Sequence, residues 1–167
     1  HLRYGNSLIG VTVKEVQEAI EWKKGETASL FGSRFAGLLL ATDLMRHVSE
    51  LSDVTSSQVQ ESRFEYRKAS DALAPFKRIL DVYTSQWFGN GTAKPQRGRT
   101  TPESPAITFL KSRKAETFIN MRDEMLKKGL NGLSGEDRSI AETALRTRER
   151  KHFFHWELEF PEVFYGP

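Results

Sequence analysis

The sequence predicts a mainly α-helical fold, with a bundle-like helical body over residues 12–151 and a short extended segment at each end. Through the body, apolar residues recur every three or four positions, which is the spacing of one helix face. Clusters of Gly and Pro separate these apolar runs from one another. Residues 1–11 and 152–167 lack this rhythm, so we expect three parts: an N-terminal extended segment, the helical body and a C-terminal extended segment.

The composition bounds the kind of protein. The 167 residues suffice for one domain with a core, and 28% charged with 38% hydrophobic residues is typical of globular proteins. The net charge of +3, with a pI of about 9.2, is too small a bias to indicate nucleic-acid binding by itself. The absence of Cys excludes disulfides and thiolate metal sites and fits a cytoplasmic protein. No apolar run approaches the length of a membrane span, so we expect no membrane contact.

The N-terminal residues LRYGNSLIG (2–10) favour the end of a strand followed by a tight turn, because Gly5 and Asn6 reach positive φ easily. Thr12 and Glu15 then form a capping-box pattern that opens the first helix, which Gly25 should close. Because the chain starts at His1 rather than Met, we expect it to be a piece of a larger protein.

Further helices are predicted along the body. One should cover about 27–51, and helical spacing resumes after Ser56. Pro75 lacks a backbone N–H and fits a first turn better than a helix interior, so we expect one helix to end before it and another to run from it to Gly89. The last helix should begin at Ser134 and end in a basic tract.

Residues 89–105 read GNGTAKPQRGRTTPESP and predict a long, mobile surface loop. Mobile basic loops can become ordered around nucleic acid, and the basic tract that ends the last helix could also reach phosphates. The candidate nucleic-acid contacts are therefore Lys94, Arg97, Arg99, Arg146, Arg148, Arg150 and Lys151. For the tract at 146–151, the plainer interpretation is a solvated helix end whose cations interact favourably with the helix dipole.

Within the C-terminal residues HFFHWELEFPEVFYG (152–166), polar and apolar positions alternate with a period of two from Phe153 to Phe160. This pattern predicts an extended segment, ended by Pro161, with one apolar and one solvated face. The apolar face carries Phe154, Trp156, Leu158 and Phe160, and the other carries Phe153, His155, Glu157 and Glu159. The His and Glu residues match no standard metal spacing, and carboxylates on one segment do not face each other across a cleft. We therefore expect neither a metal site nor a catalytic residue here.

Taken in this order, LRYGNSLIG at one end and HFFHWELEFPEVF at the other resemble the middle of large adenine-N6 DNA methyltransferases. These enzymes occur in fused restriction–modification systems and as phage-defence methylases of the BREX and DISARM kind. In that family a Gly-Asn/Asp-Ser-Leu step ends a strand of the methyltransferase sheet. The phrase F-H-W-x-L-x-F-P-E-V-F comes shortly before the strand that delivers the catalytic Asn-Pro-Pro-Tyr/Phe motif.

The resemblance implies that the chain is the helical insert of such an enzyme, with both ends belonging to a parent α/β domain on the same side of the helical body. It implies S-adenosylmethionine as the parent's cofactor, DNA as its partner, and Asn6 near the cofactor's adenine, flanked by Ser7 and Leu8. The family's glycine-rich cofactor motif and its Asn-Pro-Pro-Tyr motif are absent from this chain. We therefore expect the fragment itself to have no activity and no appreciable cofactor affinity.

Two expectations concern the isolated chain. The aromatic residues of 153–165 predict either a dimer or a tail folded back on its own helices, because exposed apolar area favours association. The alternative from another class is a free-standing helical nucleic-acid-binding or protein-interaction module, which would bind DNA in a salt-sensitive way.

Overall fold

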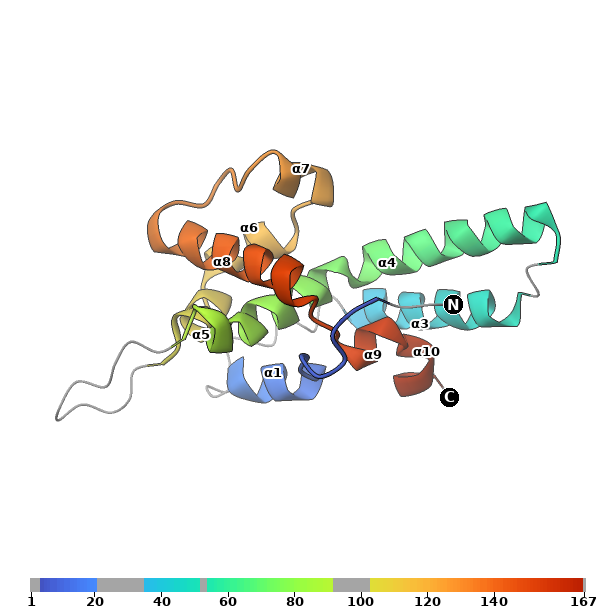
Figure 1. Cartoon of the computed structure of the whole chain (residues 1–167), viewed down its shortest axis with the longest axis horizontal. Coiled ribbons are helices and arrows are strands. Elements are labelled where there is room, and N and C mark those ends of the chain that lie inside the picture. Colours follow the sequence, from blue (N-terminus) through green and yellow to red (C-terminus); the bar gives the residue numbers. More distant parts are fainter. Residues whose placement is uncertain (1–3, 21–34, 52–53, 92–102, 167) are drawn as a thin grey trace.

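The computed structural model describes residues 4–20, 35–51, 54–91 and 103–166, and these form a mainly helical fold without a sheet (Figure 1). The predicted fold class is therefore confirmed. The longest helix, α4 (Ser56–Ser85), runs through the molecule, and the other elements pack along it. Helix α3 (Phe35–Glu50) lies beside the first half of α4, and α8 (Gly135–Lys151) packs against the second half.

The core lies along one face of α4. Ala69, Leu73, Phe76 and Leu80 recur every three or four residues and are all buried, as the apolar spacing of the sequence predicts. Smaller helices cover this face and add Val16, Phe109 and Phe118 among others to the same cluster. These helices are α1 (Val13–Ile20), α5 (Pro105–Leu110) and α6 (Arg113–Ile119). A 3-10 turn, η1 (Gln86–Phe88), ends α4, and α7 (Asp123–Lys127) follows α6.

Helix α4 does not break at Pro75, so the predicted boundary there is wrong. Pro75 removes one backbone hydrogen bond, and an interior proline costs a helix about 3 kcal/mol. Leu73 and Phe76 are both buried next to it, and burying each side chain contributes about 2 kcal/mol. Tertiary packing on both sides of Pro75 therefore outweighs the local preference to stop.

Other predicted boundaries agree with the structure. The N–H of Glu15 donates to Thr12 Oγ1 at 3.1 Å and the N–H of Thr12 donates to Glu15 Oε2 at 2.7 Å, which is the expected capping box. Ser134 precedes α8 in an extended conformation, although its side chain makes no capping hydrogen bond. Gly89 follows η1 with φ of 131°, a conformation that favours glycine. The predicted helix end at Gly25, the start of the 27–51 helix and the middle of the 89–105 loop lie outside the described residues.

The predicted extended segment over 153–160 is wrong beyond its first residues. The chain instead forms two single turns, α9 (Trp156–Glu159) and α10 (Pro161–Phe164), which fold back on α3 and α4. A strand here would need a neighbour for its backbone groups, and among the described residues the N-terminal segment provides one only as far as Phe154. Helical turns satisfy these groups locally: the N–H of Phe160 donates to the Trp156 carbonyl at 3.0 Å.

The burial of the C-terminal segment also differs from the predicted alternation. Leu158 is only 1% exposed, as expected for the apolar face, but His155 on the expected solvated face is 3% exposed. Phe153 is buried too and packs against Phe88, with ring centroids 5.7 Å apart. The tail is therefore folded back on the helical body, which is one of the two arrangements expected for it. The described helices include none with the length and apolarity that a bilayer crossing requires.

Candidate functional site

The two ends of the described chain meet and hold each other. Asn6 and Phe153 form a parallel β-bridge, in which the Asn6 N–H donates to the His152 carbonyl at 2.6 Å. The Phe154 N–H donates to the Ile9 carbonyl at 2.8 Å. We call residues 4–13 together with residues 152–157 the terminal clasp. Its existence agrees with the expectation that both ends lie on the same side of the helical body (Figure 1).

Two glycines make the clasp possible. A Cβ placed on Gly10 would lie 2.0 Å from the Phe154 carbonyl oxygen, and a Cβ on Gly5 would lie 2.4 Å from the Phe154 ring. Neither separation is sterically allowed for a side chain, so the N-terminal backbone can approach Phe154 this closely only where Cβ is missing. Both glycines of GNSLIG therefore serve the contact with the C-terminal segment as well as the turn.

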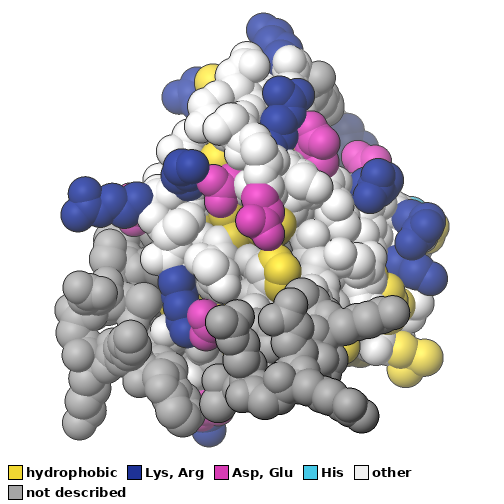
Figure 2. All heavy atoms as spheres, turned by 90° about the vertical axis from the view of Figure 1, so that its left-hand side faces the viewer, with side chains coloured by type: hydrophobic (Ala, Val, Ile, Leu, Met, Phe, Trp, Pro, Cys, Tyr) yellow, Lys and Arg dark blue, Asp and Glu magenta, His cyan; other side chains and the backbone are white. Residues whose placement is uncertain are grey.

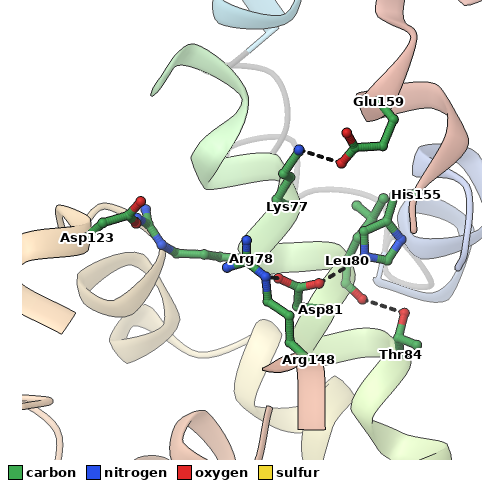
Figure 3. Close-up of polar contacts among 9 residues, drawn as sticks. All are labelled: Lys77, Arg78, Leu80, Asp81, Thr84, Asp123, Arg148, His155 and Glu159. Carbon is green, nitrogen blue, oxygen red and sulfur yellow. Dashed lines mark hydrogen bonds and ion pairs between the residues drawn. The ribbon is translucent and has the colours of Figure 1, made fainter. Parts of the chain in front are cut away.

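A buried histidine ties the clasp to α4. The Val11 N–H donates to His155 Nδ1 at 3.3 Å, so this nitrogen carries the lone pair and the ring proton sits on Nε2. Nε2 then donates to Asp81 Oδ1 at 3.0 Å (Figure 3). Since both ring nitrogens are engaged, His155 has no free site from which to act as a general base. Its role in this structure is to join three elements: the N-terminal segment, the C-terminal segment and α4.

Asp81 also holds an arginine of α8. Arg148 Nε lies 3.3 Å from Asp81 Oδ2, an ion pair whose geometry falls short of a hydrogen bond. The Asp81 side chain is only 5% exposed, and a buried carboxylate without a charged partner is costly. Figure 3 shows Arg148 reaching across to Asp81 on the side away from His155. The Asp81 carboxylate therefore contacts both α8, which precedes His152, and the C-terminal segment, which follows it.

Neighbouring cations of α4 bind two further segments. Lys77 Nζ donates to Glu159 Oε1 at 2.5 Å, which fixes α9 on α4 (Figure 3). Arg78 is buried and donates to the Ile119 carbonyl at 2.7 Å and to Asp123 Oδ1 at 2.5 Å. These pairs place α9 and the start of α7 on adjacent faces of the same helix.

Glu157 completes the clasp at the other end. Its Oε2 accepts the Val13 N–H at 2.7 Å, at the first turn of α1, and the Tyr165 hydroxyl at 2.9 Å. Burial, followed by the hydrogen bond to the Glu157 carboxylate and its negative charge, raises the pKa of the Tyr165 hydroxyl well above its ordinary value. Glu157 therefore caps a backbone N–H of α1 that has no partner within the helix, and it holds Tyr165, the residue after α10, in place.

An open groove of about 660 Å³ lies beside the clasp. Its walls come from α4, α7, α8, α9 and the clasp and include Tyr4, Tyr66, Lys77, Arg148, Glu149, His152 and Glu159. Lys77 and Arg148 are already paired with carboxylates, and Glu149 adds a further negative charge, so the groove does not concentrate positive charge. The described residues also contain no cluster of His, Asp or Glu suited to a metal ion.

The predicted site residues fall into three groups. Asn6, Ser7 and Leu8 form the exposed turn of the clasp, where Asn6 Oδ1 accepts the Leu8 N–H at 3.2 Å. In the basic tract of α8, Arg146 and Arg150 are exposed, whereas Arg148 pairs with Asp81 and Lys151 lies over the Phe88 ring. Lys94, Arg97 and Arg99 lie outside the described residues. Figure 2 shows Lys and Arg side chains interspersed with Asp and Glu on the face it presents, rather than gathered in one patch.

The residues that sequence reasoning missed are charged groups within the apolar run of α4: Lys77, Arg78 and Asp81. Arg78 and Asp81 flank Ile79 and Leu80, and all four are buried. Charged side chains on a buried stretch of helix are rare unless paired, so this run was the available signal of a polar network. The partners, Asp123, Arg148, His155 and Glu159, could not be assigned from spacing along the chain.

Comparison with family models, with curated proteins and with solved structures finds no match for this chain.

Proposed function

We propose that this chain is the helical insert of a site-specific DNA adenine-N6 methyltransferase that uses S-adenosylmethionine. The observation that carries the proposal is the terminal clasp. The two segments on which the resemblance rests, at 4–10 and 152–164, are distant in sequence and are joined in space through Asn6, Phe153 and Phe154. An insert between two strands of one sheet has to return its ends to the same place, as these ends do.

The geometry of the bridge adds support. Asn6 and Phe153 pair in parallel, which is the orientation that neighbouring strands have in the sheet of an α/β domain. Beside the bridge, Leu8 is 92% exposed and Trp156 is 49% exposed, so apolar surface remains for a neighbouring layer. A parent α/β sheet would supply that layer. Dimerisation of the isolated chain through residues 153–165 stays a prediction, and its basis is the exposed apolar side chains of that segment, Trp156, Val163 and Phe164.

In this proposal the parent enzyme supplies catalysis and most of the cofactor site, and its partner is DNA in the cytoplasm, in a restriction–modification or phage-defence setting. Asn6, with Ser7 and Leu8 beside it, lies at the edge of the cofactor's adenine. The helical body has a structural or DNA-guiding role. His155, Asp81 and Arg148 keep the two ends together, so that Asn6 has a fixed position relative to the segment that leads to the catalytic strand.

The test is a methyl-transfer assay on the full-length protein that contains this chain. Labelled S-adenosylmethionine and DNA fragments of varied sequence should give N6-methyladenine at one recognition sequence. The isolated chain should transfer no methyl group and should give no micromolar binding of S-adenosylmethionine in calorimetry. Absence of methyl transfer, together with salt-sensitive DNA binding by the isolated chain, would instead support the free-standing nucleic-acid-binding module.

A further inference from the structure

Trp156 is held rigidly beside the Asn6–Leu8 turn. Its indole N–H donates to the Ser7 carbonyl at 3.2 Å. The Phe154 ring meets it edge-on at 5.0 Å, and the Phe160 ring is stacked against it at 5.9 Å with an interplanar angle of 29°. Three contacts fix the indole, although about half of its surface is open to solvent.

The turn next to this ring presents free polar groups. Asn6 and Ser7 are exposed, and Asn6 Oδ1 accepts the Leu8 N–H, which fixes the orientation of the amide. Asn6 Nδ2 has no partner within the described part of the chain and can donate two hydrogen bonds. A half-exposed indole beside an oriented amide matches a flat heterocycle with hydrogen-bond acceptors on its edge, and among the nucleobases a purine offers the larger ring for stacking.

We propose that Trp156 is the stacking wall, and the Asn6–Leu8 turn the polar edge, of a site for a purine nucleoside. The inference rests on the proposed function, in which this nucleoside is the adenosine part of S-adenosylmethionine. It adds a residue from the C-terminal segment to a site otherwise assigned to the N-terminal turn. Because the indole N–H holds the Ser7 carbonyl, Trp156 also positions the turn. Because this chain contributes only the Trp156 ring and the Asn6–Leu8 turn to the site, adenosine alone binds weakly, in the millimolar range.

Titration of the isotope-labelled chain with adenosine, followed by NMR, tests this assignment. Saturable shifts are expected at the Trp156 indole N–H and at the amides of Asn6, Ser7 and Leu8, and cytidine should shift them less because its ring is smaller. Trp156→Ala should weaken adenosine binding about tenfold, the loss typical of one base–aromatic stack. Trp87→Ala is the matched control. Trp87 is at least as exposed as Trp156 but lies on η1, outside the clasp, so its replacement should leave adenosine binding unchanged.

Trp156→Phe keeps an aromatic face without the N–H and guards against loss of the fold. It should retain binding within about threefold of the wild-type chain while the Ser7 and Leu8 amides shift. Equal adenosine binding in the wild type and Trp156→Ala, or shifts confined to residues outside the clasp, would overturn the assignment.

The assay of the full-length protein separates this inference from the proposed function. Methyl transfer by the full-length protein without adenosine shifts at Trp156 would remove the stacking role and leave the methyltransferase intact. Adenosine shifts at Trp156 in a protein that transfers no methyl group would support the nucleoside site and contradict the methyltransferase.

Discussion

The backbone at Gly10 passes so close to Phe154 that a side chain at position 10 has no room. Phe154 also covers Gly5, and its own N–H is donated to Ile9, so one residue of the C-terminal segment contacts both sides of the N-terminal turn. His155, the next residue, accepts the Val11 N–H and donates to Asp81. At the scale of single residues, the clasp thus depends on two glycines, Gly5 and Gly10, and on His155 in one tautomer.

Gly10→Ala should lower the free energy of unfolding by about 3 kcal/mol, because a Cβ placed 2.0 Å from the Phe154 carbonyl forces the segments apart. Urea denaturation followed by circular dichroism measures the change. Gly37→Ala is the matched control: a Cβ on this α3 residue would lie 3.4 Å from the Ala72 carbonyl, an ordinary contact. It should raise stability by about 0.5–1 kcal/mol. Equal effects of the two substitutions would show that the clasp is open in solution.

His155→Ala should destabilise the chain by about 3 kcal/mol in the same measurement, because it leaves the buried Asp81 carboxylate with Arg148 alone and the Val11 N–H without its acceptor. Asp43→Ala removes an exposed ion pair with Arg46 on α3 and should cost less than about 0.5 kcal/mol. If His155→Ala proves no more harmful than Asp43→Ala, the His155–Asp81 pair does not hold the ends together.

At the scale of elements, α4 and the C-terminal turns differ most from what local sequence favours. The capping box of Thr55 and Gln58 starts α4 as a sequence rule predicts, yet Pro75 does not stop it. Alternation over 153–160 predicts a strand, yet the segment folds into α9 and α10. In both cases contacts distant in sequence decide: packing of Leu73 and Phe76 in the first, and the absence of a described neighbouring strand in the second.

Pro75→Ala should stabilise the chain by about 1–3 kcal/mol, since alanine supplies the N–H that the Asp71 carbonyl lacks within α4. Thermal unfolding measures this as a rise in Tm. Ala74→Gly, one residue earlier, should lower stability by about 1 kcal/mol if the segment is helical in solution. A lower Tm for Pro75→Ala would indicate that the chain uses the proline to bend or end the helix there.

The attachment of the tail through Tyr165 should depend on pH. The pKa of Tyr165 is raised in the folded chain, so the unfolded chain loses this proton first as pH rises above the ordinary value of 10. The hydrogen bond to Glu157 therefore stabilises the fold fully below pH 10 and progressively less above it. In urea denaturation from pH 8 to pH 11, the stability difference between wild type and Tyr165→Phe should shrink with rising pH. A constant difference would contradict the raised pKa.

At the scale of the whole molecule, the sequence predicts the helical class, because helical spacing is a local property that the core preserves. The network that joins the ends was not predictable in the same way. Asp81 and His155 are far apart in the chain, and only the fold places α4 beneath the C-terminal segment. The charged residues within the apolar run of α4 indicate a buried polar network but name no partners.

The central claim is that the clasp is part of a methyltransferase sheet, and the coding sequence that follows Pro167 tests it most directly. Sequencing this region should show a short polar connection and then an apolar strand ending in Asn-Pro-Pro-Tyr or Asn-Pro-Pro-Phe. A stop codon at this point, or a continuation without such a strand and motif, would contradict the account.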